Sequence, residues 1–170
     1  MDLGELLLGG VAVVELAHWA VPWPAAYRPL FERYAKPGTR ITPELLQAIA
    51  WKESGFNPRA VSPANANGTR DYGLMQINSA NLAHFGLTPE TALNPEASVK
   101  AAAALLAELE PHARSVGDLF SMYNAGQRPG GGPRHGLDGA YVNADYVTDA
   151  YGKWLVLRLG SFAPIQRRSV

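Results

Sequence analysis

The feature that most constrains the fold is a helix pattern that begins at Thr42 and carries a glutamate at its far end. Thr42 followed by Pro43 is a typical N-cap and first-turn pair. The next positions carry an apolar stripe at helical spacing, which we expect to be buried: Leu45, Leu46, Ile49 and Ala50. This helix places Glu53 at its C-terminal end, where burial and the negative end of the helix dipole both raise the pKa of a carboxyl group.

Further start and stop signals predict that most of the chain is helical. A short helix runs through Tyr34 and is ended by Lys36-Pro37-Gly38. Other helices are expected over 79–85, 95–109, 116–124 and 143–159. The inner face of the last helix is predicted to consist of Val147, Ala150, Tyr151, Trp154 and Leu157. Between the last two helices, residues 126–139 include six glycines and two prolines, which predicts a surface loop.

One β element is expected, over residues 60–77. Asn67-Gly68 is a tight-turn signal because both residue types accept positive φ, and residues 60–66 and 69–74 would form the two arms. Such a hairpin would project Asp71 and Gln76 toward the side of the molecule where Glu53 lies. The expected fold class is therefore α+β, mainly α, with a short β-hairpin beside the cleft that Glu53 overlooks.

Composition excludes several classes of function. The 170 residues include 15 Lys and Arg and 15 Asp and Glu, so the net charge is zero and general capture of nucleic acid is not indicated. There are no cysteines, which excludes disulfides and thiolate metal sites. The four histidines, at positions 18, 84, 112 and 135, lack the spacing of metal ligands.

The N-terminal residues 3–20 are apolar but do not have the positive charge that precedes a secretory signal, since only Asp2 and Glu5 lie there. Their apolar positions fall on one helix face, at Leu3, Leu6, Leu7, Gly10, Val13, Val14 and Ala17. This pattern favours an amphipathic helix that packs on this protein. Docking to a partner protein or a membrane surface, and an unusual export or anchor sequence, are the alternatives.

Five short motifs, in order along the chain, resemble those of the lysozyme-like superfamily, and most closely the soluble lytic transglycosylases and their shorter relatives from secretion systems and phages. They are Glu53-Ser54 with Asn57-Pro58, Ser62, Gly73-Leu74-Met75-Gln76-Ile77, Tyr123-Asn124-Ala125-Gly126 and Tyr146-Val147. The resemblance spans about residues 42–158. It implies a lysozyme-like domain over 39–160, preceded by a helical segment over 1–38 and followed by a tail over 161–170.

The resemblance implies a catalytic role for Glu53 and substrate-binding roles for polar residues after it. Glu53 would be the general acid that protonates a glycosidic oxygen and then, as a carboxylate, accepts a proton. Ser62 resembles the family serine that holds the glutamate or the substrate N-acetyl group, although a turn-forming serine before Pro63 is equally expected. Gln76 offers an amide donor and acceptor to sugar groups, or else binds neighbouring backbone.

The later motifs add two tyrosines and an asparagine. Tyr123 resembles the family tyrosine that hydrogen-bonds the glutamate or stabilises charge developing at the sugar, and a buried core tyrosine is the alternative. Asn124 belongs to the same motif and either contacts substrate or orders the local backbone. Tyr146 matches the late Tyr-Val of the family, but Tyr141-Val142 offers the same dipeptide.

The reaction implied by the resemblance is cleavage of the β-1,4 bond between N-acetylmuramic acid and N-acetylglucosamine in peptidoglycan. In a lytic transglycosylase the muramic C6 hydroxyl attacks its own anomeric carbon and leaves a 1,6-anhydro end. Because this nucleophile is intramolecular, one carboxyl group suffices, and no metal or other cofactor is needed. The expected location is the cell envelope or periplasm, or the virion if the chain is phage-encoded.

Two alternatives to this reaction remain. Asp71-Tyr72-Gly73 also resembles the animal-type lysozymes, in which an aspartate is the second carboxylate of a retaining hydrolase. The absence of cysteines and the presence of Tyr123-Asn124-Ala125-Gly126 favour the transglycosylase. A glycan-binding or structural module that has lost its chemistry is the non-enzymatic alternative.

Overall fold

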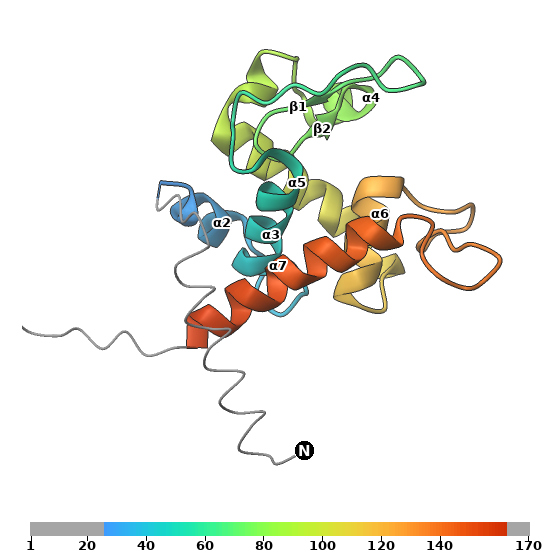
Figure 1. Ribbon diagram of the computed structural model, residues 1–170. Coiled ribbons are helices and arrows are strands. Elements are labelled where there is room, and N and C mark those ends of the chain that lie inside the picture. The colour runs from blue at the N-terminus through green and yellow to red at the C-terminus, as the bar shows by residue number, and fades with distance from the viewer. Residues whose placement is uncertain (1–25, 163–170) are drawn as a thin grey trace, which may run out of the picture.

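The computed structural model describes residues 26–162, and it is mainly helical (Figure 1). The α-helices are α2 Arg28–Tyr34, α3 Pro43–Ser54, α4 Ser79–Leu82, α5 Pro95–Leu109, α6 Val116–Ala125 and α7 Ala144–Phe162. Short 3₁₀ turns are η1 Ala83–Phe85, η2 Thr91–Leu93 and η3 Glu110–His112. The helices predicted from start and stop signals are thus confirmed to within a few residues. The helix predicted over residues 3–20 lies outside the described residues.

Helix α3 has the boundaries that its sequence predicts. The Thr42 hydroxyl accepts a hydrogen bond from the backbone N–H of Leu45 at 3.3 Å, and a proline occupies the first turn. At the other end Gly55 adopts a left-handed conformation with φ 59°, which a residue without a side chain accepts at low cost. Phe56 follows with φ 66° and donates its N–H to the carbonyl of Ala50. These contacts hold the last turn of α3, which contains Glu53, in one position.

The core surrounds α3, with α7 crossing it on one side and α2 and α5 packing on others (Figure 1). Its largest fully buried side chains include Phe31, Ile41, Leu45, Leu46, Ile49, Leu106, Leu119 and Phe120. Phe31 belongs to α2, so this helix shares the core of the helices after it. The division of the chain at residue 38 stays a prediction.

The inner face of α7 was predicted correctly except at one position. Val147, Ala150, Trp154 and Leu157 are buried, whereas Tyr151 is 39% exposed. Tyr151 lies at the edge of the apolar stripe, where its ring packs against that of Trp154 with centroids 5.1 Å apart. None of the helices within residues 26–162 has the length and apolar character required to cross a lipid bilayer.

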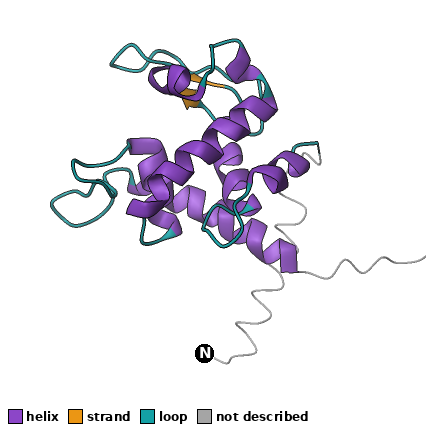
Figure 2. Cartoon of the chain, turned by 180° about the vertical axis from the view of Figure 1, so that it is seen from behind, coloured by secondary structure: helices purple, strands orange, loops and turns teal. Residues whose placement is uncertain are grey.

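The β element exists, but its regular part is not the predicted hairpin. Strands β1 Asp71–Tyr72 and β2 Ile77–Asn78 pair antiparallel and form a small sheet at one end of the helical body (Figure 2). They flank a turn over 73–76 and not Asn67-Gly68. The chain does turn at Asn67-Gly68, but only Gly68 has positive φ there, and the first predicted arm contributes a single bridge between Val61 and Tyr72.

The turn over 73–76 is fixed by contacts with a distant part of the chain. A Cβ atom on Gly73, whose φ is 79°, would lie 2.1 Å from the carbonyl oxygen of Ala92. The buried Ser98 of α5 accepts a hydrogen bond from the backbone N–H of Met75 at 3.0 Å. The sequence around the turn could not reveal these contacts, because η2 and α5 follow it by about twenty residues.

Candidate active site

Glu53 lies largely buried in the last turn of α3, and a tyrosine from α7 donates a hydrogen bond to it. The Tyr146 hydroxyl lies 2.5 Å from Oε1 of Glu53. Burial raises the pKa of Glu53 to about 7, and the negative charge of Asp71 adds to this effect. The hydrogen bond from Tyr146 and the positive charge of Lys52 act in the opposite direction but are outweighed. Near neutral pH this carboxyl group can therefore either donate or accept a proton.

Tyr146 is held in place by a cluster of charges between α3 and α7. The Lys52 ammonium group lies 5.4 Å from the centre of the Tyr146 ring and 2.6 Å from a carboxylate oxygen of Asp149. Lys153 forms a second ion pair with Asp149, and both lysines lower the pKa of that carboxyl group. Burial and the nearby Glu53 charge hold the pKa of Tyr146 well above its ordinary value, so its hydroxyl remains a donor.

The structure distinguishes the two Tyr-Val dipeptides. Tyr146 contacts Glu53, whereas the hydroxyl of Tyr141 donates to Asp118 at 2.7 Å. Asp118 is buried at the start of α6 and also accepts from the backbone N–H of Arg114. Tyr141 therefore joins the segment before α7 to α6, and Tyr146 is the tyrosine at the candidate site.

Asp71 is the other carboxylate of this region, and it is held by three polar side chains. It accepts hydrogen bonds from the amide nitrogens of Asn78 at 2.7 Å and Asn65 at 3.1 Å. The Ser62 hydroxyl lies 3.2 Å from the Asp71 carboxylate and accepts from the Asp71 backbone N–H at 2.9 Å. The structure therefore brings Ser62 to Asp71, and among the described residues Ser62 has no hydrogen bond with Glu53. These contacts order the hairpin.

Gln76 and Tyr123 both bind the backbone of the turn over 73–76. The Gln76 amide nitrogen donates to the carbonyls of Ala60 and Gly73, so the backbone contact that sequence analysis allowed is present. Its Oε1 atom is the part of the side chain available to a sugar donor. The Tyr123 hydroxyl donates to the carbonyl of Met75 at 2.7 Å, so the hydrogen bond to Glu53 comes from Tyr146 and not from Tyr123. The charge of Glu53 still contributes to the raised pKa of Tyr123, after the larger effect of burial.

Asn124 lies at the exposed end of α6 and binds the segment that leads into α7. Its side-chain oxygen accepts a hydrogen bond from the Asn143 amide at 2.9 Å. Asn143 in turn accepts from the Ser121 hydroxyl at 2.8 Å. This arrangement orders the backbone between α6 and α7, which was one of the two roles expected of Asn124. A contact with substrate stays a prediction.

Sequence analysis gave no role to several residues that position the site. The Ser54 hydroxyl donates to the carbonyl of Leu74 at 2.7 Å and thereby ties the end of α3 to the turn over 73–76. Asn65 and Asn78 hold Asp71, and Ser98 anchors Met75. The only signals in the sequence were the positions of Ser54 beside Glu53 and of Asn78 directly after the Gly73-Leu74-Met75-Gln76-Ile77 motif. Within residues 26–162 no group of three or more His, Asp or Glu side chains is placed to hold a metal ion.

Known proteins resemble this chain over most of its described helices. The family model described as the transglycosylase SLT domain matches residues 31–131. Protein IpgF of Shigella flexneri is 43% identical over 102 residues, which make up 58% of this chain and 63% of that protein. Protein virB1 of Agrobacterium fabrum is 32% identical over 141 residues, covering 66% of this chain and 55% of that protein. The chain thus spans less than two thirds of the length of these relatives.

A solved structure supports the same relationship. The crystal structure of the 70 kDa soluble lytic transglycosylase SLT70 from Escherichia coli matches with a TM-score of 0.52 and 25% sequence identity, over 81% of this chain and 21% of that one. The predicted fold class, a mainly helical lysozyme-like fold with a short hairpin, is confirmed by this match. Because the family model covers more than half of the 170 residues, the chain belongs to the transglycosylase SLT domain family.

Proposed function

We propose that this protein is a peptidoglycan lytic transglycosylase that cleaves the β-1,4 bond between N-acetylmuramic acid and N-acetylglucosamine. The observation that carries the proposal is Glu53, a largely buried carboxyl group whose pKa is about 7 and whose Oε1 accepts a hydrogen bond from Tyr146. Membership of the SLT family supports the reaction class, as does the E. coli neighbour, which is named a soluble lytic transglycosylase. Lowering the barrier of glycoside cleavage at neutral pH requires an acid of this kind.

The proposed reaction uses the same carboxyl group twice. Glu53 first gives its proton to the bridging oxygen, which leaves with the bonding electron pair as the hydroxyl of the departing sugar. The resulting carboxylate then takes the proton of the muramic C6 hydroxyl as that oxygen bonds to the anomeric carbon. Glu53 ends protonated, no water is consumed, and the product is a 1,6-anhydro end. Because the nucleophile belongs to the same sugar, its effective concentration is high and a second carboxylate is unnecessary.

The other residues of the site have supporting roles in this proposal. Tyr146 fixes the orientation of Glu53, and Tyr123 holds the turn over 73–76 beside it. The free Oε1 of Gln76 is proposed to accept from a sugar N–H or hydroxyl group. Ser62 and Asn124 are proposed to contact substrate with whatever hydrogen-bonding capacity their protein partners leave. These assignments rest on the family resemblance and on the position of each side chain.

A retaining hydrolase that uses Asp71 is the second candidate. In favour of it, the charge of Asp71 is close enough to Glu53 to raise the pKa of that group. Against it, the Asp71 carboxylate already accepts hydrogen bonds from two asparagine amides and lies beside the Ser62 hydroxyl. A nucleophilic carboxylate would have to give up part of this bonding in order to attack the sugar. We therefore assign to Asp71 the ordering of the hairpin.

The products of the reaction distinguish the two candidates. Mass spectrometry of muropeptides released from purified cell walls should show 1,6-anhydromuramic ends, which are lighter by one water than the reducing ends left by a hydrolase. In the same assay Asp71→Asn should lose at most about tenfold in rate, because Asp71 takes no part in the proposed chemistry and the amide oxygen can still accept from Asn78. Reducing ends, together with an Asp71→Asn variant that is inactive, would establish the hydrolase instead. A protein that binds walls without releasing any muropeptide would be a glycan-binding module.

We infer the cell envelope or periplasm as the place of action, since the proposed substrate lies there, or the virion if the chain is phage-encoded. The proposed partner is the peptidoglycan strand. A partner protein or a membrane surface bound through residues 3–20 stays a prediction about a segment outside the described residues.

A further inference from the structure

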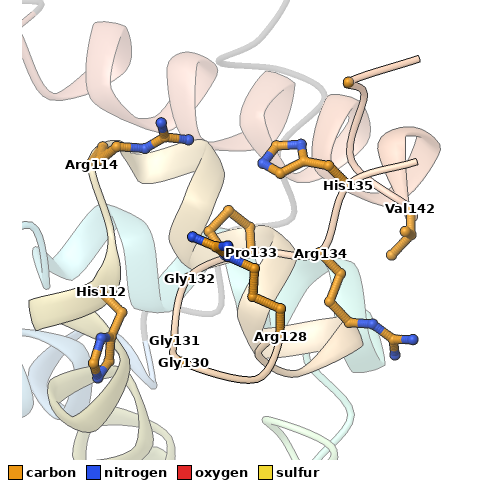
Figure 3. Close-up of a pocket in the computed structure, with 11 residues that line it drawn as sticks. His112, Arg114, Arg128, Gly130, Gly131, Gly132, Pro133, Arg134, His135 and Val142 are labelled. Carbon is orange, nitrogen blue, oxygen red and sulfur yellow. The ribbon is translucent and has the colours of Figure 1, made fainter. Parts of the chain in front are cut away.

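A cavity of about 920 Å³ opens beside the segment between α6 and α7, and Glu53 is not among the residues that line it. Five of the lining side chains are basic: Arg114, Arg128, Arg134, His112 and His135. Figure 3 shows Arg114 and His135 reaching toward each other from opposite sides of the cavity, with Arg128 extending between them from the loop below. A site of this size is in the range that holds a small ligand or a short peptide.

The positive charge of this cavity is local and only partly paired. Arg114 forms an ion pair with Asp118 at 3.3 Å. Among the described residues that line the cavity there is no aspartate or glutamate. No carboxylate within residues 26–162 forms an ion pair with Arg128 or Arg134. The one acidic residue between positions 126 and 143, Asp138, accepts a hydrogen bond from the backbone N–H of Ala140 within its own turn. Since the whole chain has zero net charge, the concentration of arginine here is not a consequence of its composition.

The backbone around the cavity has a defined shape. Arg128 and Gly132 are joined by a backbone hydrogen bond of 3.0 Å, and the N–H of Gly131 donates to the Arg128 carbonyl at 3.0 Å. Gly131 approaches the imidazole of His112 closely, since a Cβ atom at this position would be 2.4 Å from Nδ1. Pro133 is buried and so provides part of the floor.

The segment that forms the cavity is continuous with the candidate active site. It begins directly after α6, whose Tyr123 holds the turn over 73–76, and it ends in α7, whose Tyr146 contacts Glu53. The hydrogen bond between Asn124 and Asn143 closes the base of the segment. Val142 lines the cavity just before α7 begins, and Tyr146 in the first turn of α7 contacts Glu53, so the cavity and the candidate site lie at the same end of this helix.

We propose that this cavity binds the carboxylates of the peptide stem carried by the muramic acid of the glycan strand. The inference rests on the proposed function, because it assigns a second part of the same substrate. The sugar backbone of the strand is largely uncharged, whereas stem peptides carry free carboxylates. The planar guanidinium group donates two parallel hydrogen bonds to a carboxylate, so Arg128 and Arg134 suit this ligand. A peptide also fits the volume better than a single small anion.

A binding experiment tests the cavity without requiring catalysis. We would titrate the full chain with a soluble stem peptide that has free carboxylates, and with the same peptide after its carboxylates have been converted to amides. The free peptide should bind, amidation should weaken binding by about tenfold or more, and Arg128→Gln and Arg134→Gln should each do the same. Arg28→Gln removes an equal charge from α2, which lies away from the α6–α7 segment, and should leave the affinity unchanged (Figure 1).

Three results of this titration would overturn the inference. The first is equal binding of the free and amidated peptides, and the second is equal weakening by Arg28→Gln and by Arg128→Gln. The third is binding of a soluble polyphosphate in place of the peptide, which would indicate a phosphate-bearing polymer as the ligand. Circular dichroism would reveal a variant that fails to fold. If one of the two arginine variants does so, the other still tests the cavity.

A second experiment connects the cavity to the reaction. Wild-type protein should cleave glycan strands that carry stems faster than strands from which an amidase has removed them. Arg128→Gln should remove this preference and leave the rate on bare strands within about twofold of wild type, because Arg128 does not contact Glu53. Equal wild-type rates on both kinds of strand would contradict the stem site but not the proposed function. A wild-type protein inactive on both would contradict the proposed function, and the titration would still test the cavity.

Discussion

The surroundings of Glu53 and the cavity beside the α6–α7 segment differ in how their charged groups are satisfied. Around Glu53 nearly every polar group has a protein partner: Tyr146 binds Glu53, Asp71 binds two asparagines, and Lys52 binds Asp149. In the cavity, Arg128 and Arg134 have no ion pair with any described residue. The first region is built from side chains that hold one another, and the second presents charges to a ligand.

This difference corresponds to two kinds of work. Acid–base chemistry needs a carboxyl group held in one orientation, since a misplaced proton donor loses much of its effect. Capture of a charged ligand needs donors whose hydrogen bonds are still available, and their exposure to water keeps the cost of the unpaired charges small. Substitutions near Glu53 should therefore change the rate or the stability of the protein, and substitutions in the cavity should change ligand affinity.

The largest effect is expected from Glu53→Gln, which keeps the shape of the side chain but removes its proton. Clearing of cell walls should fall by about two orders of magnitude or more, which is the contribution typical of a general acid. Glu44→Gln makes the same chemical change in the first turn of the same helix and should keep activity within about twofold. Turbidity assays at neutral pH compare the two variants. A Glu53→Gln protein with activity within a few-fold of wild type would contradict the assignment.

The same variant also tests whether Glu53 is buried at an energetic cost. Its pKa is about 7 in the folded protein against 4.5 for an ordinary glutamate, so the folded state retains the proton over this pH range and the unfolded chain releases it. The wild-type free energy of unfolding should therefore fall as pH rises from 4.5 to about 7. Glu53→Gln has no such titration, so its free energy of unfolding should not show this fall. Between about pH 4 and about pH 8 the stability of the variant relative to wild type should therefore increase by about 2–3 kcal/mol. Denaturant unfolding at both pH values measures the gain, and parallel curves for the two proteins would mean that Glu53 is solvated.

Replacing one glycine from each region with alanine should destabilise the protein by different amounts. Gly73 and Gly130 both have positive φ, but a Cβ atom on Gly73 would lie 2.1 Å from the Ala92 carbonyl oxygen, whereas nothing lies within 4 Å of one on Gly130. Gly130→Ala should cost about 1 kcal/mol, for the left-handed backbone alone. Gly73→Ala adds a steric overlap with backbone and should cost about 3 kcal/mol in total. Thermal or denaturant unfolding gives both values. Equal losses would mean that the turn over 73–76 can move away from Ala92.

Sequence analysis succeeded where a feature depends on neighbouring residues and failed where it depends on residues far apart in the chain. The boundaries of α3 and α5 depend on local signals, such as Thr42 and Asn94 at their N-caps, and they were predicted correctly. The hairpin depends on Ala92 and Ser98, which no local pattern links to Gly73 and Met75. Asn67-Gly68 was therefore taken for the hairpin turn because its local signal is the stronger one.

The candidate site shows the same limit. Glu53 could be found from its place at the end of an apolar helix and from the motif around it. Its contact with Tyr146 joins residues 93 positions apart, and Tyr141 carried the same dipeptide signal. The resemblance matched Tyr146 to the late Tyr-Val and left Tyr141 as a competing match, and only the packing of α7 on α3 determines which of them reaches Glu53. The partners of Asp71 were missed because single asparagines in a loop resemble ordinary turn residues.

The smallest of these effects, and the most specific, is expected from the two tyrosines. Tyr146→Phe removes the hydrogen bond that lowers the pKa of Glu53, so this pKa should rise further above 7. The alkaline limb of the pH–rate profile, where the acid form is lost, should then move to higher pH, and the rate near neutral pH should fall about three- to tenfold as the carboxyl group loses its orientation. Tyr141→Phe removes the hydrogen bond to Asp118 and should cost about 1–3 kcal/mol of stability without moving the profile. Profiles of kcat/KM against pH for both variants make the comparison. A shift to lower pH in Tyr146→Phe, or an equal shift in Tyr141→Phe, would show that the hydrogen bond from Tyr146 does not control the protonation of Glu53.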